Sequence, residues 1–332
     1  MIFAYFLALA LWLHAPAAAQ TGLNCPELKP RARAVTISRM QPLRRGGKWL
    51  EGSPKNSAST SCDPRGMKTG EAEYDGKKLL LRHSYVYTEK EEARAVCAGL
   101  KTGERPDTTF SDEDRSPADE FCRRALKKDF GVVLVHDASP GAGPENARKP
   151  VRQIFRLYGH RGLVAEERSF DQLMNLESVT LYAYDKAGDL TGRTVSDFDG
   201  RQLGREAFTR SKAANSREHA VYGENDQLLK KTVYELREDG SLRREVRSVY
   251  DPAGQEASRS EIYCDEKGRP LKELAYDADA AEPKYEYTYA YKYDAKGNWT
   301  EERKTRMMIY NGKRLADTQY APEISRRELS YY

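Results

Sequence analysis

Hydrophobic and polar residues alternate along much of the second half of the chain, which is the pattern of half-buried β-strands. The clearest case is residues 284–293, where every second position is tyrosine and the positions between are mostly charged or small. Successive side chains of a strand point to opposite faces, so this segment predicts one face of five tyrosines: Tyr285, Tyr287, Tyr289, Tyr291 and Tyr293. We expect the rings to pack as part of the sheet with their hydroxyls at its rim, and the alternative is a platform on which glycans stack.

Short turn motifs separate the predicted strands. They begin with aspartate and reach glycine three residues later, at Asp185–Gly188, Asp251–Gly254, Asp265–Gly268 and Asp294–Gly297. Aspartate can accept hydrogen bonds from backbone amides further along the turn, and glycine can adopt the positive φ of a bulged hairpin. Gly240, Gly254 and Gly268 lie 14 residues apart, and Asp226 continues the spacing one step earlier. This repeat predicts one strand of about ten residues per turn, in an antiparallel meander.

The first half of the chain has a less regular pattern. Apolar and β-branched residues predict strands at Ala34–Met40, at Gly131–His136, and at Glu71–Tyr87 with its own turn at Asp75-Gly76-Lys77. Two segments have the pattern of short helices, Glu89–Ala98 and Ala118–Lys128.

Two segments rich in glycine, proline, serine and asparagine, Ser53–Pro64 and Ala138–Pro150, predict loops. The second is the better domain boundary. We therefore expect a mainly β protein with a signal peptide at residues 1–19, a smaller mixed N-terminal region at 20–150, and an antiparallel β-repeat domain at 151–332. The alternative is that the N-terminal strands start the same sheet.

The beginning of the chain resembles a secretory signal. Ile2–Leu13 is an apolar run, followed by Pro16 and by Ala17-Ala18-Ala19, which fits a cleavage site. No lysine or arginine precedes the run, which departs from the usual pattern. The run is too short for a membrane span, and Asn24 before Cys25 does not fit a lipoprotein signal. We expect an exported periplasmic or secreted protein with no stable membrane span after cleavage.

Export gives meaning to the five cysteines, because an oxidising compartment permits disulfides. The simplest pairing joins Cys25 to Cys62 and Cys97 to Cys122, although other pairings remain open. Cys264 is then the one cysteine without a predicted disulfide partner. Asp265 and Glu266 follow it, so we expect a buried, inert thiol rather than a nucleophile.

The composition favours a folded protein without a nucleic-acid site. Mean hydropathy is low at −0.80, yet the chain has 21 tyrosines, which disordered chains lack. The 55 basic and 51 acidic residues are mixed along the chain, whereas a nucleic-acid binder shows a stripe of one sign.

The repeat half resembles the YD-repeat (RHS-like) family of bacterial envelope and secreted proteins. The resemblance covers roughly Tyr158–Tyr332 and rests on the four turns above and on YDAKGNWTEERK at Tyr293–Lys304. It implies long antiparallel sheets and a setting outside the cytoplasm. Members that wrap around a toxin are far longer than this chain, so the resemblance does not imply toxin delivery.

Motifs for catalysis, cofactors and metals are absent from the sequence. It has no G-x-S-x-G, H-E-x-x-H, C-x-x-C or P-loop pattern. His136-Asp137 is the one pair suited to acid–base chemistry, and Asp197–Gly200 has half of a calcium loop but fits a turn better. We assign no catalytic, cofactor-binding or metal-binding residue. The expected function is a non-enzymatic module that binds an envelope protein or a glycan, and the alternative is a hydrolase-like enzyme with a site around His136 and Asp137.

Overall fold

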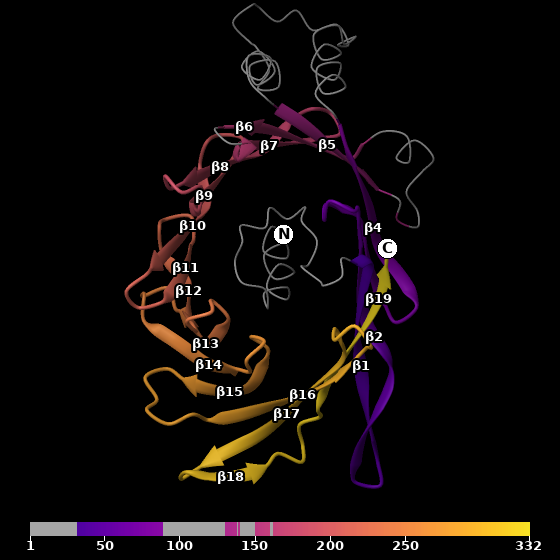
Figure 1. Cartoon of the computed structure of the whole chain (residues 1–332), viewed down its shortest axis with the longest axis vertical. Coiled ribbons are helices and arrows are strands. Elements are labelled where there is room, and N and C mark those ends of the chain that lie inside the picture. The colour runs from indigo at the N-terminus through magenta and orange to yellow at the C-terminus, as the bar shows by residue number, and fades with distance from the viewer. Residues whose placement is uncertain (1–31, 89–129, 138, 140–149, 160–161) are drawn as a thin grey trace, which may run out of the picture. The chain divides into compact units, whose positions relative to one another are not determined.

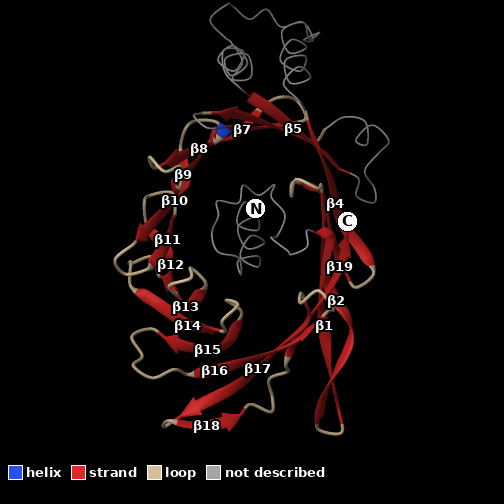
Figure 2. Cartoon of the chain, in the orientation of Figure 1, coloured by secondary structure: helices blue, strands red, loops and turns tan. Residues whose placement is uncertain are grey.

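The computed structural model describes residues 32–88, 130–137, 139, 150–159 and 162–332. Within these ranges the chain forms nineteen β-strands and no α-helix. Figures 1 and 2 show the strands, and the short blue segment near β7 in Figure 2 is a 3-10 turn at residue 162. These residues contain no helix of the length and apolar character needed to cross a membrane. The predicted mainly β fold is confirmed. The predicted helices, the signal peptide and most of the segment 138–150 lie outside the described residues, so the mixed N-terminal region stays a prediction.

The strands follow one another along the chain, and most of their connections are short; the two longer ones, between β4 and β5 and between β5 and β6, lie mostly outside the described residues. Their bounds are β1 (Ala32–Arg45), β2 (Lys48–Cys62), β3 (Lys68–Asp75), β4 (Lys78–Tyr87), β5 (Phe130–Asp137), β6 (Arg152–Tyr158), β7 (Val164–Asp171), β8 (Leu176–Tyr184), β9 (Leu190–Asp197), β10 (Gln202–Ser211), β11 (Ser216–Tyr222), β12 (Leu228–Leu236), β13 (Leu242–Tyr250), β14 (Glu256–Cys264), β15 (Pro270–Asp277), β16 (Tyr285–Tyr293), β17 (Trp299–Tyr310), β18 (Lys313–Ala316) and β19 (Glu323–Tyr331).

The chain divides into two compact units. The first contains Phe208–Ala220, Leu228–Tyr332 and the described residues up to Leu80, and the second contains Val221–Gln227 and the described residues of Leu81–Ala207. The predicted domains at 20–150 and 151–332 concern independent folding, which this division does not test, so they stay a prediction.

Antiparallel pairing of sequence neighbours dominates each unit. In the second unit β4 to β10 pair in chain order. In the first unit β12 to β17 do the same. There β17 pairs on its other side with β18 and with β19, and β19 pairs with β1, which pairs with β2. The predicted antiparallel meander is confirmed. In addition, β19 pairs with β1, although the two strands are far apart in the sequence.

The turns have the predicted chemistry. Gly254 has a φ of 79°, and its amide donates a hydrogen bond to the Asp251 carbonyl at 3.0 Å. The Asp251 carboxylate accepts the amides of Ala253 and Gln255, both at 2.9 Å. The three other predicted turns repeat this arrangement. Asp197 does the same, so Asp197–Gly200 is a turn, as expected.

The prediction of a loop at Ser53–Pro64 is wrong, because most of this segment belongs to β2. Residues Asn56–Ser61 pair with β1 on one side and with β3 on the other. Thr36 also donates a hydroxyl hydrogen bond to Ser59 at 3.0 Å. Pairing on both edges satisfies the backbone of a polar segment, and this outweighs its low intrinsic strand preference. The predicted strands Ala34–Met40, Glu71–Tyr87 and Gly131–His136 are confirmed.

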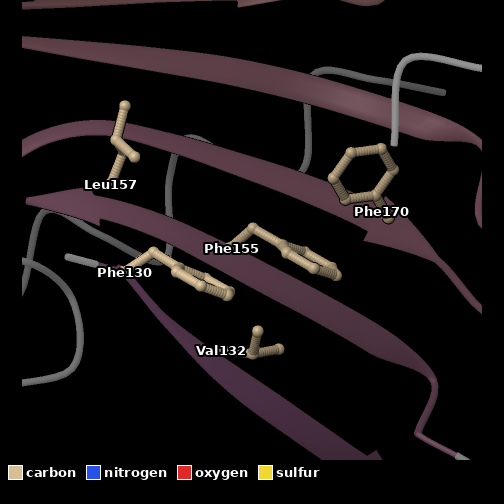
Figure 3. Packing of buried hydrophobic residues seen from close by; sticks show 5 residues of the cluster. All are labelled: Phe130, Val132, Phe155, Leu157 and Phe170. Atoms are coloured by element: carbon tan, nitrogen blue, oxygen red, sulfur yellow. The ribbon is translucent and has the colours of Figure 1, made fainter. Parts of the chain in front are cut away.

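The largest apolar side chains of the second unit gather on one face of β5, β6 and β7. Figure 3 shows the cluster, which consists of Phe130, Val132, Phe155, Leu157 and Phe170. Phe155 and Phe170 are fully buried, with ring centroids 5.2 Å apart in an edge-to-face contact. Val133 and Val135 are buried as well, so β5 is covered on both faces. This explains why its sequence is a continuous apolar run instead of an alternating one.

We expect replacement of Gly254 by valine to destabilise the protein by about 1–2 kcal/mol, because a β-branched residue is strained at positive φ. A Cβ atom at this position would meet no atom within 4 Å, so the effect isolates backbone strain. Gly254→Asn is the matched control and should cost clearly less, since asparagine tolerates this conformation. Urea denaturation followed by circular dichroism measures both. A valine variant as stable as the wild type would contradict the turn assignment.

Candidate functional site

The five tyrosines of β16 lie on one face of the first unit, as predicted. Tyr285, Tyr287, Tyr289 and Tyr291 are half-buried, and Tyr293 is 41% exposed. Three of the four residues between them are exposed, and the exception is the buried Glu286. We call the side of the sheet that carries these five rings the tyrosine face.

Cations from β17 and from the turn before β15 cover the rings. Tyr287 is opposite Arg306 in the pairing of β16 with β17, and Tyr289 is opposite Lys304. The Lys304 ammonium lies 4.1 Å from the Tyr287 ring centroid and 5.4 Å from that of Tyr289. Arg306 lies 4.5 Å from the Tyr285 centroid, and Arg269 covers Tyr293 at 4.6 Å. These cation–π contacts occupy ring faces that a stacked sugar would need, which favours packing over a stacking platform.

Buried carboxylates balance these cations. Glu273 of β15 is buried and accepts hydrogen bonds from the Lys304 ammonium, at 2.7 Å, and from the Tyr289 hydroxyl. Burial alone would raise the pKa of Glu273, but the charge and hydrogen bond of Lys304, together with the Tyr289 hydrogen bond and the Arg247 charge, outweigh it and hold that pKa below its usual value. Burial, followed by the Glu273 charge, raises the pKa of Tyr289, so its hydroxyl stays protonated. Lys304, Glu273 and Tyr289 therefore form one coupled, satisfied group.

A second group on the same face is not fully satisfied. Tyr291 is opposite Glu302 in the pairing of β16 with β17, and Glu302 is opposite Ser325 of β19. Arg327, two residues further along β19, points to the same face and lies 3.7 Å from the centroid of Trp299. Its buried Nε has no hydrogen-bond partner among the described residues. We call Tyr291, Glu302 and Arg327 the polar centre.

Burial controls the ionisation of the polar centre. It lowers the pKa of Arg327 to about 10, although the charge of Glu302 partly opposes the change. It also raises the pKa of Glu302, against the opposing effects of Tyr291, Lys304 and Arg327. Buried polar groups normally have partners, and an unpartnered one indicates a place for water or for a ligand group. The sequence did not single out Glu302 or Arg327, because only the strand register brings them beside Tyr291.

The side chains of His136 and Asp137 do not form a functional pair in the structure. They are consecutive residues of β5, so their side chains point to opposite faces. The Asp137 carboxylate accepts the Ser139 amide at 2.8 Å, and hydrogen bonds from Ser139 lower its pKa. The buried Nδ1 of His136 has no hydrogen-bond partner among the described residues. The cross-strand partner of Asp137 is His83 of β4, a pairing that no sequence pattern predicts.

The cysteines are only partly described. Cys264 is buried and free, and burial, reinforced by Glu245 and Asp265, raises the pKa of its thiol to about 12. This agrees with the expected inert thiol. Cys62 lies buried at the end of β2, whereas Cys25, Cys97 and Cys122 lie outside the described residues. The disulfide pairing stays a prediction.

Other kinds of site are weaker in the described part of the chain. It contains no group of three or more histidine, cysteine, aspartate or glutamate side chains placed to hold a metal ion. A pocket of about 270 Å³ in the second unit is lined by residues of β8, β9 and β10, including Tyr182, Gly192 and Glu206. Its volume is below the roughly 300–1,000 Å³ of small-molecule sites. The polar centre is therefore the best candidate site.

Comparisons with known proteins leave the family open. No family model matches the chain, and no curated protein matches it. Among solved structures, the chain is similar to a porin-like protein from Bacteroides uniformis, with 10% identity, a TM-score of 0.40, and coverage of 90% of this chain and 96% of the other. A porin-like protein from Bacteroides vulgatus gives 12% identity, a TM-score of 0.27, and coverage of 91% and 98%. The TcdB2-TccC3-Cdc42 structure gives 11% identity, a TM-score of 0.19, and coverage of 80% and 15%.

Proposed function

We propose that the chain is an exported, non-enzymatic binding module that takes an envelope protein or a glycan on its tyrosine face. The observation that carries the proposal is the polar centre, where the buried Nε of Arg327 lacks a partner beside Tyr291 and Glu302. We propose that the Arg327 side chain shifts on binding, so that a carbonyl, carboxylate or sugar hydroxyl oxygen of the partner accepts the hydrogen bond of its Nε. A buried donor that gains such a partner contributes more to binding than an exposed one.

The chemistry of the face limits the partner. Lys304 and Arg306 are already paired with Glu273 and Asp317, at 2.7 and 2.6 Å. The face therefore offers alternating charges instead of a positive stripe, and we propose that the partner is not a nucleic acid. A glycan would bind through hydrogen bonds at the polar centre, because cations cover the adjacent ring faces.

The proposal also includes the cellular compartment, the type of repeat and the disulfides. We propose a periplasmic or secreted protein of the YD-repeat type, with disulfides joining Cys25 to Cys62 and Cys97 to Cys122. The predicted signal at residues 1–19 and the aspartate–glycine turns support this assignment.

The test is a glycan-array and envelope-extract capture with the exported chain. We expect a partner that binds the wild type and binds the Tyr291→Phe/Arg327→Met variant at least tenfold more weakly, because about 1.5–3 kcal/mol of hydrogen bonding to a charged group is lost. The control carries the same two changes at exposed positions outside the polar centre, Tyr310→Phe and Arg82→Met, and should bind like the wild type. A partner that binds the Tyr291→Phe/Arg327→Met variant as tightly as the wild type would contradict the proposal.

A further inference from the structure

The far end of the β1–β2 hairpin pairs only with itself among the described residues. The pairing of β1 with β19 covers Ala32–Arg39, and that of β2 with β3 covers Asn56–Cys62. Beyond these limits, residues 40–54 form a two-stranded ribbon, visible in Figure 1 as two twisted strands joined by a tight turn. We call residues 40–54 the hairpin tip. An isolated ribbon is marginally stable in water, so contacts of its own must hold it.

Specific contacts give the hairpin tip a defined shape. Gly46 and Gly47 both have positive φ, 57° and 75°, as a two-residue hairpin turn requires. The Arg44 guanidinium lies 5.4 Å from the Trp49 ring centroid, and the indole N–H donates to the Thr318 carbonyl at 3.2 Å. Glu51 pairs with Arg326 at 2.8 Å. One face of the ribbon is thus tied to the rest of the first unit.

The opposite face combines apolar and cationic side chains. Leu43 is directly opposite Leu50, and Arg45 is directly opposite Lys48. Residues two apart on a strand share a face, so the two leucines and the two cations lie together. Leu43 is 50% exposed and Leu50 is 47% exposed. Between Met40 and Leu50 the sequence has three cations and no acid.

We propose that this face of the hairpin tip binds an anionic lipid surface. A narrow ribbon end offers no groove for a folded protein, whereas it can enter the headgroup region of a bilayer. There Arg45 and Lys48 would meet lipid phosphates, and the two leucines would reach the acyl boundary, as in other peripheral anchors. This site is separate from the tyrosine face and goes beyond the function proposed for it.

The test is co-sedimentation of the exported chain with vesicles of phosphatidylcholine containing phosphatidylglycerol. We expect binding that falls with added salt and that pure phosphatidylcholine does not support. Arg45→Gln/Lys48→Gln should weaken binding roughly 25-fold, about fivefold for each cation. Leu43→Ser/Leu50→Ser should weaken it about tenfold without a change in charge.

Two control variants distinguish lipid binding by the hairpin tip from a nonspecific effect of positive charge and from binding by the tyrosine face. Lys186→Gln/Lys212→Gln removes two exposed cations elsewhere and should leave lipid binding unchanged, as should Tyr291→Phe/Arg327→Met. Lack of binding to anionic vesicles, or an equal loss in the Lys186/Lys212 control, would overturn the proposal. Binding to polyglutamate but not to vesicles would overturn it in favour of an acidic polypeptide partner.

Discussion

Replacing Phe155 with alanine is expected to destabilise the second unit by about 3–5 kcal/mol, the cost of removing a fully buried aromatic ring. Phe155 has no exposed surface and makes the edge-to-face contact with Phe170 seen in Figure 3. Its loss leaves a cavity among rings that β5, β6 and β7 hold in place. The shift of the urea midpoint, followed by circular dichroism, measures the effect.

The matched control is Phe198→Ala. Phe198 lies in the Asp197–Gly200 turn and is 65% exposed, so its loss should change stability by less than about 0.5 kcal/mol. Equal effects of the two substitutions would show that the cluster in Figure 3 is not the core of this unit.

Replacing Lys304 with methionine is expected to destabilise the first unit by about 3 kcal/mol at pH 7.5. The change removes the ion pair of Glu273 at 2.7 Å and leaves a buried carboxylate without its hydrogen-bonded counter-ion. Breaking such a pair costs more than replacing both partners. The double variant Lys304→Met/Glu273→Gln should therefore recover most of the loss, to within about 1 kcal/mol of the wild type.

The same variant should change the pH dependence of stability. In the wild type the Glu273 pKa is lowered, so its contribution is present above the unfolded pKa and is lost as pH falls through the folded pKa. Without Lys304, only the Tyr289 hydrogen bond and the Arg247 charge oppose burial, so we expect the pKa of Glu273 to rise and its carboxyl to regain the proton on mild acidification. The stability gap between variant and wild type should narrow by about 1 kcal/mol or more between pH 7.5 and pH 5. A gap that is constant with pH would show that Glu273 is not the group left unpaired.

Local chemistry made the turns predictable. Each aspartate and its glycine lie three residues apart, and the hydrogen bonds that fix the turn stay within five residues, as at Asp251. The same turn also forms where glycine is absent. Met174 has a φ of 65° in the turn after Asp171, and its side chain packs against the Phe155 cluster. A pattern that requires glycine misses this turn.

Register between distant strands explains what the sequence did not predict. The alternation in β16 predicted the tyrosine face, but the cations over its rings come from β17 and from the turn before β15. Arg327 joins the polar centre only because β19 pairs with β17 through Glu301–Lys304, after the separate pairing of β18 further along the same strand. No periodicity within one segment contains that information. The polar segment of β2 was not predicted as a strand for a similar reason, because its pairing with β1 and β3 stabilises it.

Binding through the polar centre is tested most directly by titrating the captured partner into three forms of the exported chain: the wild type, Tyr291→Phe/Arg327→Met, and Tyr310→Phe/Arg82→Met. Circular dichroism first confirms that all three are folded. The dissociation constant should rise at least tenfold for the polar-centre variant and stay at the wild-type value for the control. Equal dissociation constants for all three forms would contradict the proposed binding site.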